Sequence, residues 1–480
     1  MQRNSFLKTV CNLAVPVALQ SMLQASFGIV DQIMIGQLGS VSVAGVGLAG
    51  KFSSIFTVVV SAIGAVAGIM ISQYMGQENK KEIRRSFYLN LVIALLLAGG
   101  FTAICLAVPE KIMGIYTEDK STMRAAASYL AITAATYLPI AGATLLSTMF
   151  RCLEKASLPL YASIAAALLN TGLNYILIFG KFGLPVMGAD GAAVATVVSQ
   201  LVNFLIMFAM IFRYADLLCT EGNRQCANAV TDKCTTKGVP DDNGKLEEMK
   251  QDKKSSAEAS VSRFNWKQYL SMLLPILVCE FLWSLGENVY AIIYGRLGTQ
   301  ACAAMTLINP IQSLMIGALC GLSQAAGVII GKRLGNEEYD EAYWSAKQLV
   351  LYGAVGAAVL SVLIILTRGI YVEIYQVEDA VKALTKQILV AYALVAPFKV
   401  LNMILGGGVI RSGGKTKYVM VIDMIGTWGF GVPLGMITAF VLKLSIPYVY
   451  FILSLEECVR FIISVFVFRS KKWMQKLEAE

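Results

Sequence analysis

Long apolar stretches recur along the whole chain, and each is close to the length of a helix that spans a bilayer. Twelve such stretches are predicted, six on either side of a polar gap. They cover residues 12–36, 44–75, 87–109, 125–150, 158–180, 191–212, 269–294, 301–330, 347–367, 385–410, 417–442 and 446–468. The expected fold class is therefore an all-α integral membrane protein with twelve transmembrane helices.

Composition agrees with this expectation and excludes several function classes. Charged residues make up 15% of the chain, against about 25% in a soluble domain. The absence of histidine excludes Ser-His-Asp and Cys-His catalysis and His-ligated metal sites, so we expect no enzyme. The ten cysteines form no CxxC pairs, and we expect reduced thiols with no structural metal and no cofactor. The first apolar stretch exceeds 20 residues and contains Asp31, which favours a retained span over a cleaved signal peptide.

The polar gap covers residues 214–268 and contains no apolar run long enough to span. Its basic and acidic residues balance, which is typical of a flexible linker. We therefore expect an N-terminal six-helix lobe over 1–213, a cytoplasmic linker over 214–268 and a C-terminal six-helix lobe over 269–480.

The two halves are copies of each other. When the chain is shifted by 259 residues, Pro16 falls on Pro275, Gly36 on Gly295 and Gly76 on Gly335. Near the fourth loop of each half the shift becomes 260, and Arg151 falls on Arg411. Both copies place their basic loops on the same side, which predicts parallel repeats related by an axis along the membrane normal.

Lys and Arg are concentrated in the loops on one side of the predicted helices. That side includes the loops around residues 80–85, 151–155, 332–333 and 411–417, and the tail from 469. The positive-inside rule then places both termini in the cytoplasm, in a multi-pass protein that we expect in the plasma membrane. The net charge of +9 is thereby explained by topology, and no nucleic-acid partner is expected.

Charged residues within the apolar stretches are candidates for function, because a charge at mid-membrane costs about 2.5–3.5 kcal/mol. Asp31 has no basic neighbour on its own helix, so a bound proton or cation would stabilise it. Glu280 and Glu287 are two helical turns apart and share a face. The acids are not duplicated between the halves: Ser21 corresponds to Glu280, and Tyr290 corresponds to Asp31. This specialisation favours a functional role for Asp31 and Glu280 and leaves Glu287 open.

Asn170 and Asn174 lie one helical turn apart in the fifth stretch. Two amides in lipid need polar partners, and they either join neighbouring helices or help a carboxylate to hold a cation.

Four charges are expected to have structural partners. Glu456 and Arg460 have the spacing of an intrahelical ion pair, and Asp423 follows a basic loop whose lysines could answer it. Lys399 is expected to pair with an acid across the bundle. No GxxxxGK[ST] loop occurs in the chain, so transport driven by ATP is not supported.

The ordered motifs of the chain resemble the multidrug and toxic compound extrusion (MATE) transporters. The resemblance rests on Pro16, the run Asp31–Gly39, the stretch Gly68–Gly76, the segment from Asn170 through Thr196, Pro275 with Glu280 and Tyr294–Gly298, and Arg411–Gly414. It covers nearly the whole chain except the linker. It implies a fold of two six-helix lobes that exports amphipathic, often cationic compounds against an inward flow of H+ or Na+.

The resemblance also assigns roles to individual residues. Asp31 matches the first-helix acid of cation coupling, Asn170 and Asn174 match the polar pair of the fifth helix, and Glu280 matches the seventh-helix acid of the sodium-coupled branch. Some proton-coupled members have Asp where this chain has Asn174. The tenth-helix acid of the sodium-coupled branch is missing, because its place is near Val400. Asp31 and Glu280 are the acids to which the resemblance assigns coupling, and transient Na+ binding is expected at one of them. Glu287 and Lys399 are expected along the substrate pathway.

We therefore expect a monomeric secondary antiporter for small amphipathic cations in the lipid bilayer, with H+ or Na+ as coupling ion. Two alternatives remain open. A lipid-linked oligosaccharide flippase of a related kind predicts a basic groove, whereas the central charges here are mostly acidic. A membrane-embedded transferase needs catalytic acids in an extramembrane loop, and the loops here are short.

Overall fold

The computed structural model describes residues 3–38, 40–117, 119–183, 185–212, 266–373, 375 and 378–477. Helices account for most of these residues, turns and short loops for the rest, and no strand occurs among them. Most of the segment predicted as a linker lies outside the described residues.

The helices of the first lobe agree with the first six predicted stretches. They are α1 (Arg3–Gly36), α2 (Ser40–Gly76), α3 (Lys80–Ala107), α4 (Pro109–Gly114), α5 (Lys120–Thr133), η1 (Ala134–Thr136), α6 (Tyr137–Cys152), α7 (Ser157–Phe179) and α8 (Gly188–Ile211). The segments α5, η1 and α6 follow one another without a break and together form one span. The short α4 lies between the third and fourth spans.

The second lobe repeats the arrangement with more irregular helices. Its elements are α12 (Trp266–Arg296), α13 (Thr299–Gly335), α14 (Tyr339–Glu373), α15 (Asp379–Asn402), η3 (Met403–Ile410), α16 (Thr416–Asp423), η4 (Met424–Gly431), α17 (Val432–Met436), η5 (Ile437–Val441), α18 (Ile446–Ser454) and α19 (Glu456–Arg469). Eleven helical stretches of the described chain are long and apolar enough to cross a membrane. The twelfth predicted span is α18 with α19, which join at Leu455.

The predicted repeat is visible in the element boundaries. The helix α2 covers 40–76 and α13 covers 299–335, so both ends agree at the shift of 259. The turn after each helix contains a glutamate in the left-handed region, Glu78 at φ 54° and Glu337 at φ 64°. Two copies of one helical unit therefore build the molecule.

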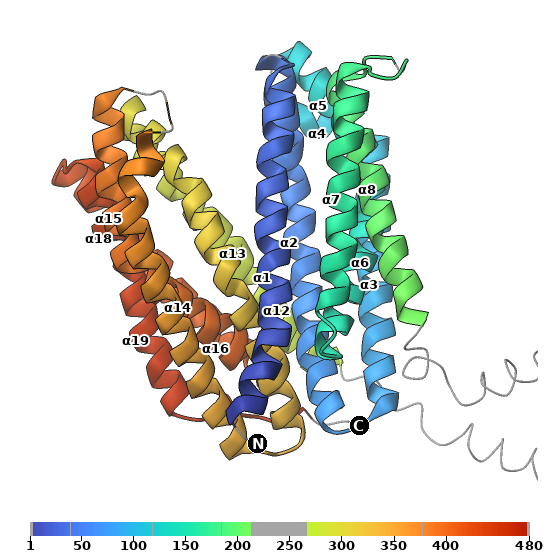
Figure 1. The fold of residues 1–480 in the computed structure, drawn as a ribbon, viewed down its shortest axis with the longest axis vertical. Helices are drawn as coiled ribbons and strands as arrows, with labels where there is room; N and C mark the ends of the chain where they lie inside the picture. Colours follow the sequence, from blue (N-terminus) through green and yellow to red (C-terminus); the bar gives the residue numbers. More distant parts are fainter. Residues whose placement is uncertain are drawn as a thin grey trace, which may run out of the picture.

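The two lobes meet at the end where the termini lie and separate toward the other end (Figure 1). At the closed end α1 and α2 pack against α13. A Cβ added to Gly76 would lie 1.9 Å from the carbonyl oxygen of Lys332, and one added to Gly335 would lie 2.0 Å from that of Gln73. These two contacts exchange under the shift of 259, as parallel repeats about a two-fold axis require. Glycine is needed at both positions, because only it lets the backbones approach this closely.

The C-terminal tail adds a further connection between the lobes at the closed end. The buried side chain of Gln73 donates to the carbonyl of Ser412 at 2.7 Å and accepts from the backbone N–H of Leu477 at 2.6 Å. Trp473 is fully buried, and its indole donates to the carbonyl of Phe468. Lys476 binds Glu337 at 2.7 Å and holds the pKa of that carboxyl below its usual range. The tail thus ties residues of both lobes together.

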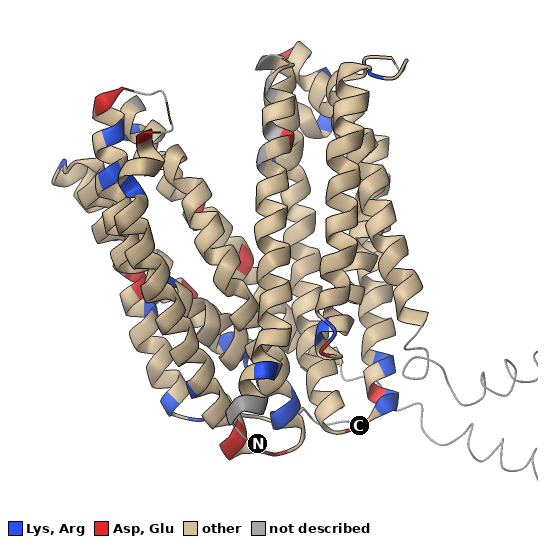
Figure 2. Ribbon diagram, viewed as in Figure 1, with Lys and Arg blue, Asp and Glu red and all other residues tan. Residues whose placement is uncertain are grey.

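Charges occur mainly near the ends of the helices, and long parts of each helix carry none (Figure 2). A few charged residues lie between the ends of the helices. These residues, beginning with Asp31 and Glu280, are the starting point for the candidate site.

Candidate functional site

The first-lobe residues predicted from sequence come together around Asp31. The amide of Asn174 on α7 donates to Oδ1 of Asp31 on α1 at 2.7 Å, and it also donates to Oδ1 of Asn170 at 3.2 Å. The two asparagines face α1 because they are one helical turn apart. The structure therefore brings Asp31, Asn170 and Asn174, which the sequence singled out separately, into one group.

The sixth span closes this group from the other side. Asn170 donates to Ser199 at 3.3 Å and to Thr196 at 3.5 Å, both on α8. In the alternative orientation of its amide, Asn170 donates instead to both oxygens of Asp31, at 3.0 and 3.1 Å. The buried Oδ1 of Asn174 has no hydrogen-bond partner in the structure. A carboxylate beside an unsatisfied amide oxygen is an arrangement that a cation would complete.

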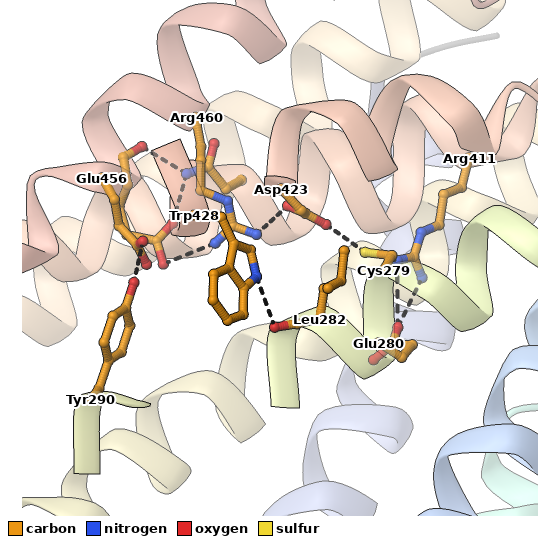
Figure 3. Close-up of polar contacts among 11 residues, drawn as sticks. Cys279, Glu280, Leu282, Tyr290, Arg411, Asp423, Trp428, Glu456 and Arg460 are labelled. Atoms are coloured by element: carbon orange, nitrogen blue, oxygen red, sulfur yellow. Dashed lines mark hydrogen bonds and ion pairs between the residues drawn. The ribbon is translucent and has the colours of Figure 1, made fainter. Parts of the chain in front are cut away.

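Glu280 lies in a different environment in the second lobe. Its carboxylate forms an ion pair with Arg411, with Oε1 and Nη2 3.4 Å apart. The neighbouring Cys279 donates to Asp423 at 2.7 Å (Figure 3). The charge of Glu280 is thus already compensated by a basic side chain, in contrast to the charge of Asp31.

Arg460 connects two further acids, and here two sequence expectations were wrong. Arg460 pairs with Asp423 (Figure 3). Its Nη1 also lies 3.5 Å from Oε1 of Glu457. The expected partners were Glu456 for Arg460 and a loop lysine for Asp423. Arg460 pairs with Asp423 and not with Glu456, because Asp423 on α16 faces it from the neighbouring helix. Glu457, three residues before Arg460 on α19, is its second acid. Asn402 also donates to Glu457 at 2.8 Å.

Glu456 instead accepts a hydrogen bond from the hydroxyl of Tyr290 on α12 (Figure 3). Both residues line a partly open cavity of about 330 Å³ between α12, α13, α15, α18 and α19. Glu287 and Lys399, predicted for the substrate pathway, line the same cavity. Within the described chain, Lys399 forms no ion pair shorter than 4 Å, so the expected partner across the bundle is not found.

Sequence reasoning did not assign a role to Tyr290, although the repeat contained the signal. Under the shift of 259, Tyr290 occupies the position of Asp31. The polar Tyr290 therefore identifies the position in the second lobe that corresponds to the Asp31 site of the first lobe.

Comparisons with known proteins agree with this architecture. The family model MatE matches residues 16–176 and 275–437, one segment in each lobe. The uncharacterized transporter YisQ of Bacillus subtilis is 21% identical over 466 residues, covering 97% of this chain and 94% of that protein. The probable multidrug resistance protein NorM of Thermotoga maritima is 23% identical over 481 residues, covering 98% and 93%.

Solved structures share the fold at low sequence identity. A crystal structure of MATE in complex with MaL6 superposes with a TM-score of 0.81 at 17% identity, covering 96% of this chain and 95% of that one. The outward-facing conformation of a multidrug resistance MATE family transporter of the MOP superfamily gives 0.81 at 16% identity, covering 97% and 96%.

Proposed function

The chain belongs to the MatE family, and from this premise we propose that it exports amphipathic, often cationic compounds in exchange for H+ or Na+. It is a multi-pass membrane transporter of the MATE multidrug efflux family. The proposal concerns the coupling ion, the nature of the substrate and the residues that exchange one for the other.

The observation that carries the proposal is the group around Asp31. Its carboxylate is held by Asn174, whose own Oδ1 is buried without a partner. No basic side chain pairs with Asp31 among the described residues. This half-buried negative charge is stabilised by a proton or a cation, because removing a charge from water without a compensating partner costs free energy. Exchange follows when a cationic substrate and the coupling ion compete for that charge.

Glu280 is the weaker candidate for the same role. An ion entering at Glu280 would have to displace Arg411 from its ion pair. This supports coupling through Asp31 in the first lobe. The missing acid near Val400 supports the same choice.

The arrangement of the lobes supports alternating access as the transport mechanism. The lobes are closed at the end of the termini and apart at the other end (Figure 1). Rocking of one repeat against the other would open the closed end and close the open one. The second-lobe cavity with Glu287 and Lys399 is the proposed region of substrate contact. We expect a monomer in the plasma membrane with both termini in the cytoplasm.

Topology and transport are tested separately. An epitope tag after Glu480 should react with antibody only after the cells are permeabilised, and reaction in intact cells would contradict the proposed orientation. Efflux of a fluorescent organic cation from proteoliposomes, under separate H+ and Na+ gradients, identifies the coupling ion. Efflux that responds to neither gradient would refute the antiport proposal.

A further inference from the structure

We propose that Glu456, hydrogen-bonded to Tyr290 at the second-lobe counterpart of the Asp31 site, is a second proton-exchange site of this transporter. The inference rests on the proposed function, because it adds a second exchanged proton to the same transport cycle. This second site lies on the last span, and the proposal that Asp31 couples transport does not depend on it.

The repeat places this pair at the equivalent of the first-lobe site. Tyr290 on α12 corresponds to Asp31 on α1. Glu456 begins α19, in the sixth span of its lobe, and the sixth span of the first lobe is α8, which carries Thr196. In the first lobe the acid comes from the first span, and the Thr196 hydroxyl on the sixth span belongs to the same group through its hydrogen bond from Asn170. In the second lobe the acid, Glu456, comes from the sixth span and the hydroxyl, Tyr290, from the first.

Glu456 is buried, with 6% of its surface exposed, and its hydrogen bond comes from an uncharged hydroxyl. The backbone of η4 covers the pair closely. A Cβ added to Gly431 would lie 2.0 Å from Oε2 of Glu456 and 2.1 Å from the hydroxyl oxygen of Tyr290. A carboxyl enclosed in this way is stable when it carries a proton, because an ionised group without an ion-pair partner would cost several kcal/mol.

The neighbouring basic groups are used elsewhere. Arg411 pairs with Glu280, and Arg460 is shared between Asp423 and Glu457. Lys399 on α15 interacts with Glu456 only across the cavity, without an ion pair shorter than 4 Å in the described part of the chain. The titratable and charged groups that surround Glu456 are Glu457 and Arg460 on α19, Lys399 and Tyr392 on α15, Tyr290, Tyr294 and Glu287 on α12, and Tyr450 on α18.

The cavity gives the proton a route. It is lined by Glu456 and by two buried tyrosines, Tyr294 and Tyr392, whose hydroxyls have no hydrogen-bond partner among the described residues. When the site releases its proton, the O–H bond of the Glu456 carboxyl breaks, the electron pair stays on the carboxylate, and the proton passes to solvent in the cavity. Lys399 is then placed to compensate the new charge across the cavity. Lys399 lines the cavity as a positive charge without an ion pair shorter than 4 Å in the described chain, which disfavours Na+ there and leaves a proton as the ligand.

The test uses infrared difference spectroscopy of the full chain in proteoliposomes during a pH titration. We expect a carbonyl stretch of a protonated carboxyl at neutral pH that disappears at alkaline pH in the parent protein. Glu456→Gln should remove this band, and Tyr290→Phe should move it to higher wavenumber because one hydrogen bond is lost. The matched control is Glu457→Gln, which removes the adjacent acid: the band should still be present, and it should disappear at lower pH than in the parent because a neighbouring negative charge is missing. In Lys399→Met the band should persist to higher pH, because a compensating charge is missing.

A transport measurement completes the test. The number of protons exchanged for each exported cation, obtained from the gradient at which net flux stops, should fall by one in Glu456→Gln and be restored in Glu456→Asp. An unchanged band in Glu456→Gln, or a shift of the band with Na+ at fixed pH, would overturn the proposal. Failure of the antiport proposal has a different signature: Asp31→Asn would then transport at the parental rate while the Glu456 band remained.

Discussion

Replacing Gly335 by alanine should open the closed end of the molecule. Gly335 ends α13 where that helix crosses α2, and its added Cβ would lie 2.0 Å from the carbonyl oxygen of Gln73. Ordinary van der Waals contact begins near 3.4 Å, so the two backbones must separate by about 1.4 Å. The contact lies between the lobes, and the added methyl therefore penalises the closed arrangement and not the folding of either lobe.

The size of the effect follows from the cost of overpacking. Forcing an additional methyl group into a tight contact costs about 1–3 kcal/mol. If the full cost falls on the closed arrangement, the ratio of closed to open molecules at this end falls by about 5- to 150-fold. Gly76→Ala should have a similar effect, because a Cβ added to Gly76 would lie 1.9 Å from the carbonyl oxygen of Lys332, at the symmetry-related crossing.

Spin-label distances measure this ratio directly. Labels at Lys80 and Asp340 lie at the start of α3 and of its repeat α14, and both side chains are exposed. Double electron–electron resonance should show a longer distance gaining population in Gly335→Ala. The matched control is Gly100→Ala on α3, where an added Cβ meets no atom within 4 Å. A distance distribution in Gly335→Ala that equals that of the control would refute the reasoning.

Three further outcomes follow from contacts described above. Asn174→Ala removes the amide that donates to Asp31 at 2.7 Å, and a hydrogen bond to a charged group is worth about 1.5–3 kcal/mol. The coupling-ion concentration for half-maximal transport should therefore rise at least tenfold, and an unchanged concentration would contradict this. Glu280→Gln leaves Arg411 without its ion-pair partner and should lower the free energy of unfolding, measured by thermal melts, by about 1–3 kcal/mol. The double variant with Arg411→Gln should recover this stability, and equal melting of the single variant and the parent would argue against the pair. Trp473→Ala removes a fully buried side chain, a change that destabilises the packed state by about 3–5 kcal/mol. The tail should then detach and be cleaved faster by protease, and unchanged cleavage would show that its docking does not depend on Trp473.

Much of the architecture could be predicted from the sequence, because lipid imposes a minimum length on each apolar stretch. The repeat matched Gly76 with Gly335, and these glycines end α2 and α13, although the predicted stretches 44–75 and 301–330 were shorter than the two helices. The spacing of one helical turn placed Asn170 and Asn174 on one face and required polar partners for them, but it did not identify Asp31 on another helix as the partner of Asn174.

The partners of the second-lobe charges could not be predicted in the same way. Helical spacing identifies residues on one face, but it does not tell which neighbouring helix brings a competing charge. Asp423 displaced Glu456 from Arg460 because α16 packs beside α19. The π-helical segments η3 and η4 change the rotation of the chain within the tenth and eleventh spans, and no apolar period reveals them. The docking of the tail was also unforeseen, because its burial depends on a single large side chain, Trp473.

The central claim is that the charge of Asp31 couples the ion to the substrate. Asp31→Asn preserves the shape of the side chain and part of its hydrogen bonding, but fixes the site as neutral. The most direct test measures gradient-driven efflux of a fluorescent organic cation from proteoliposomes containing equal amounts of the parent and of Asp31→Asn. We predict that the variant inserts normally and loses gradient-driven export, under both H+ and Na+ gradients. Export by Asp31→Asn at the parental rate would contradict the account.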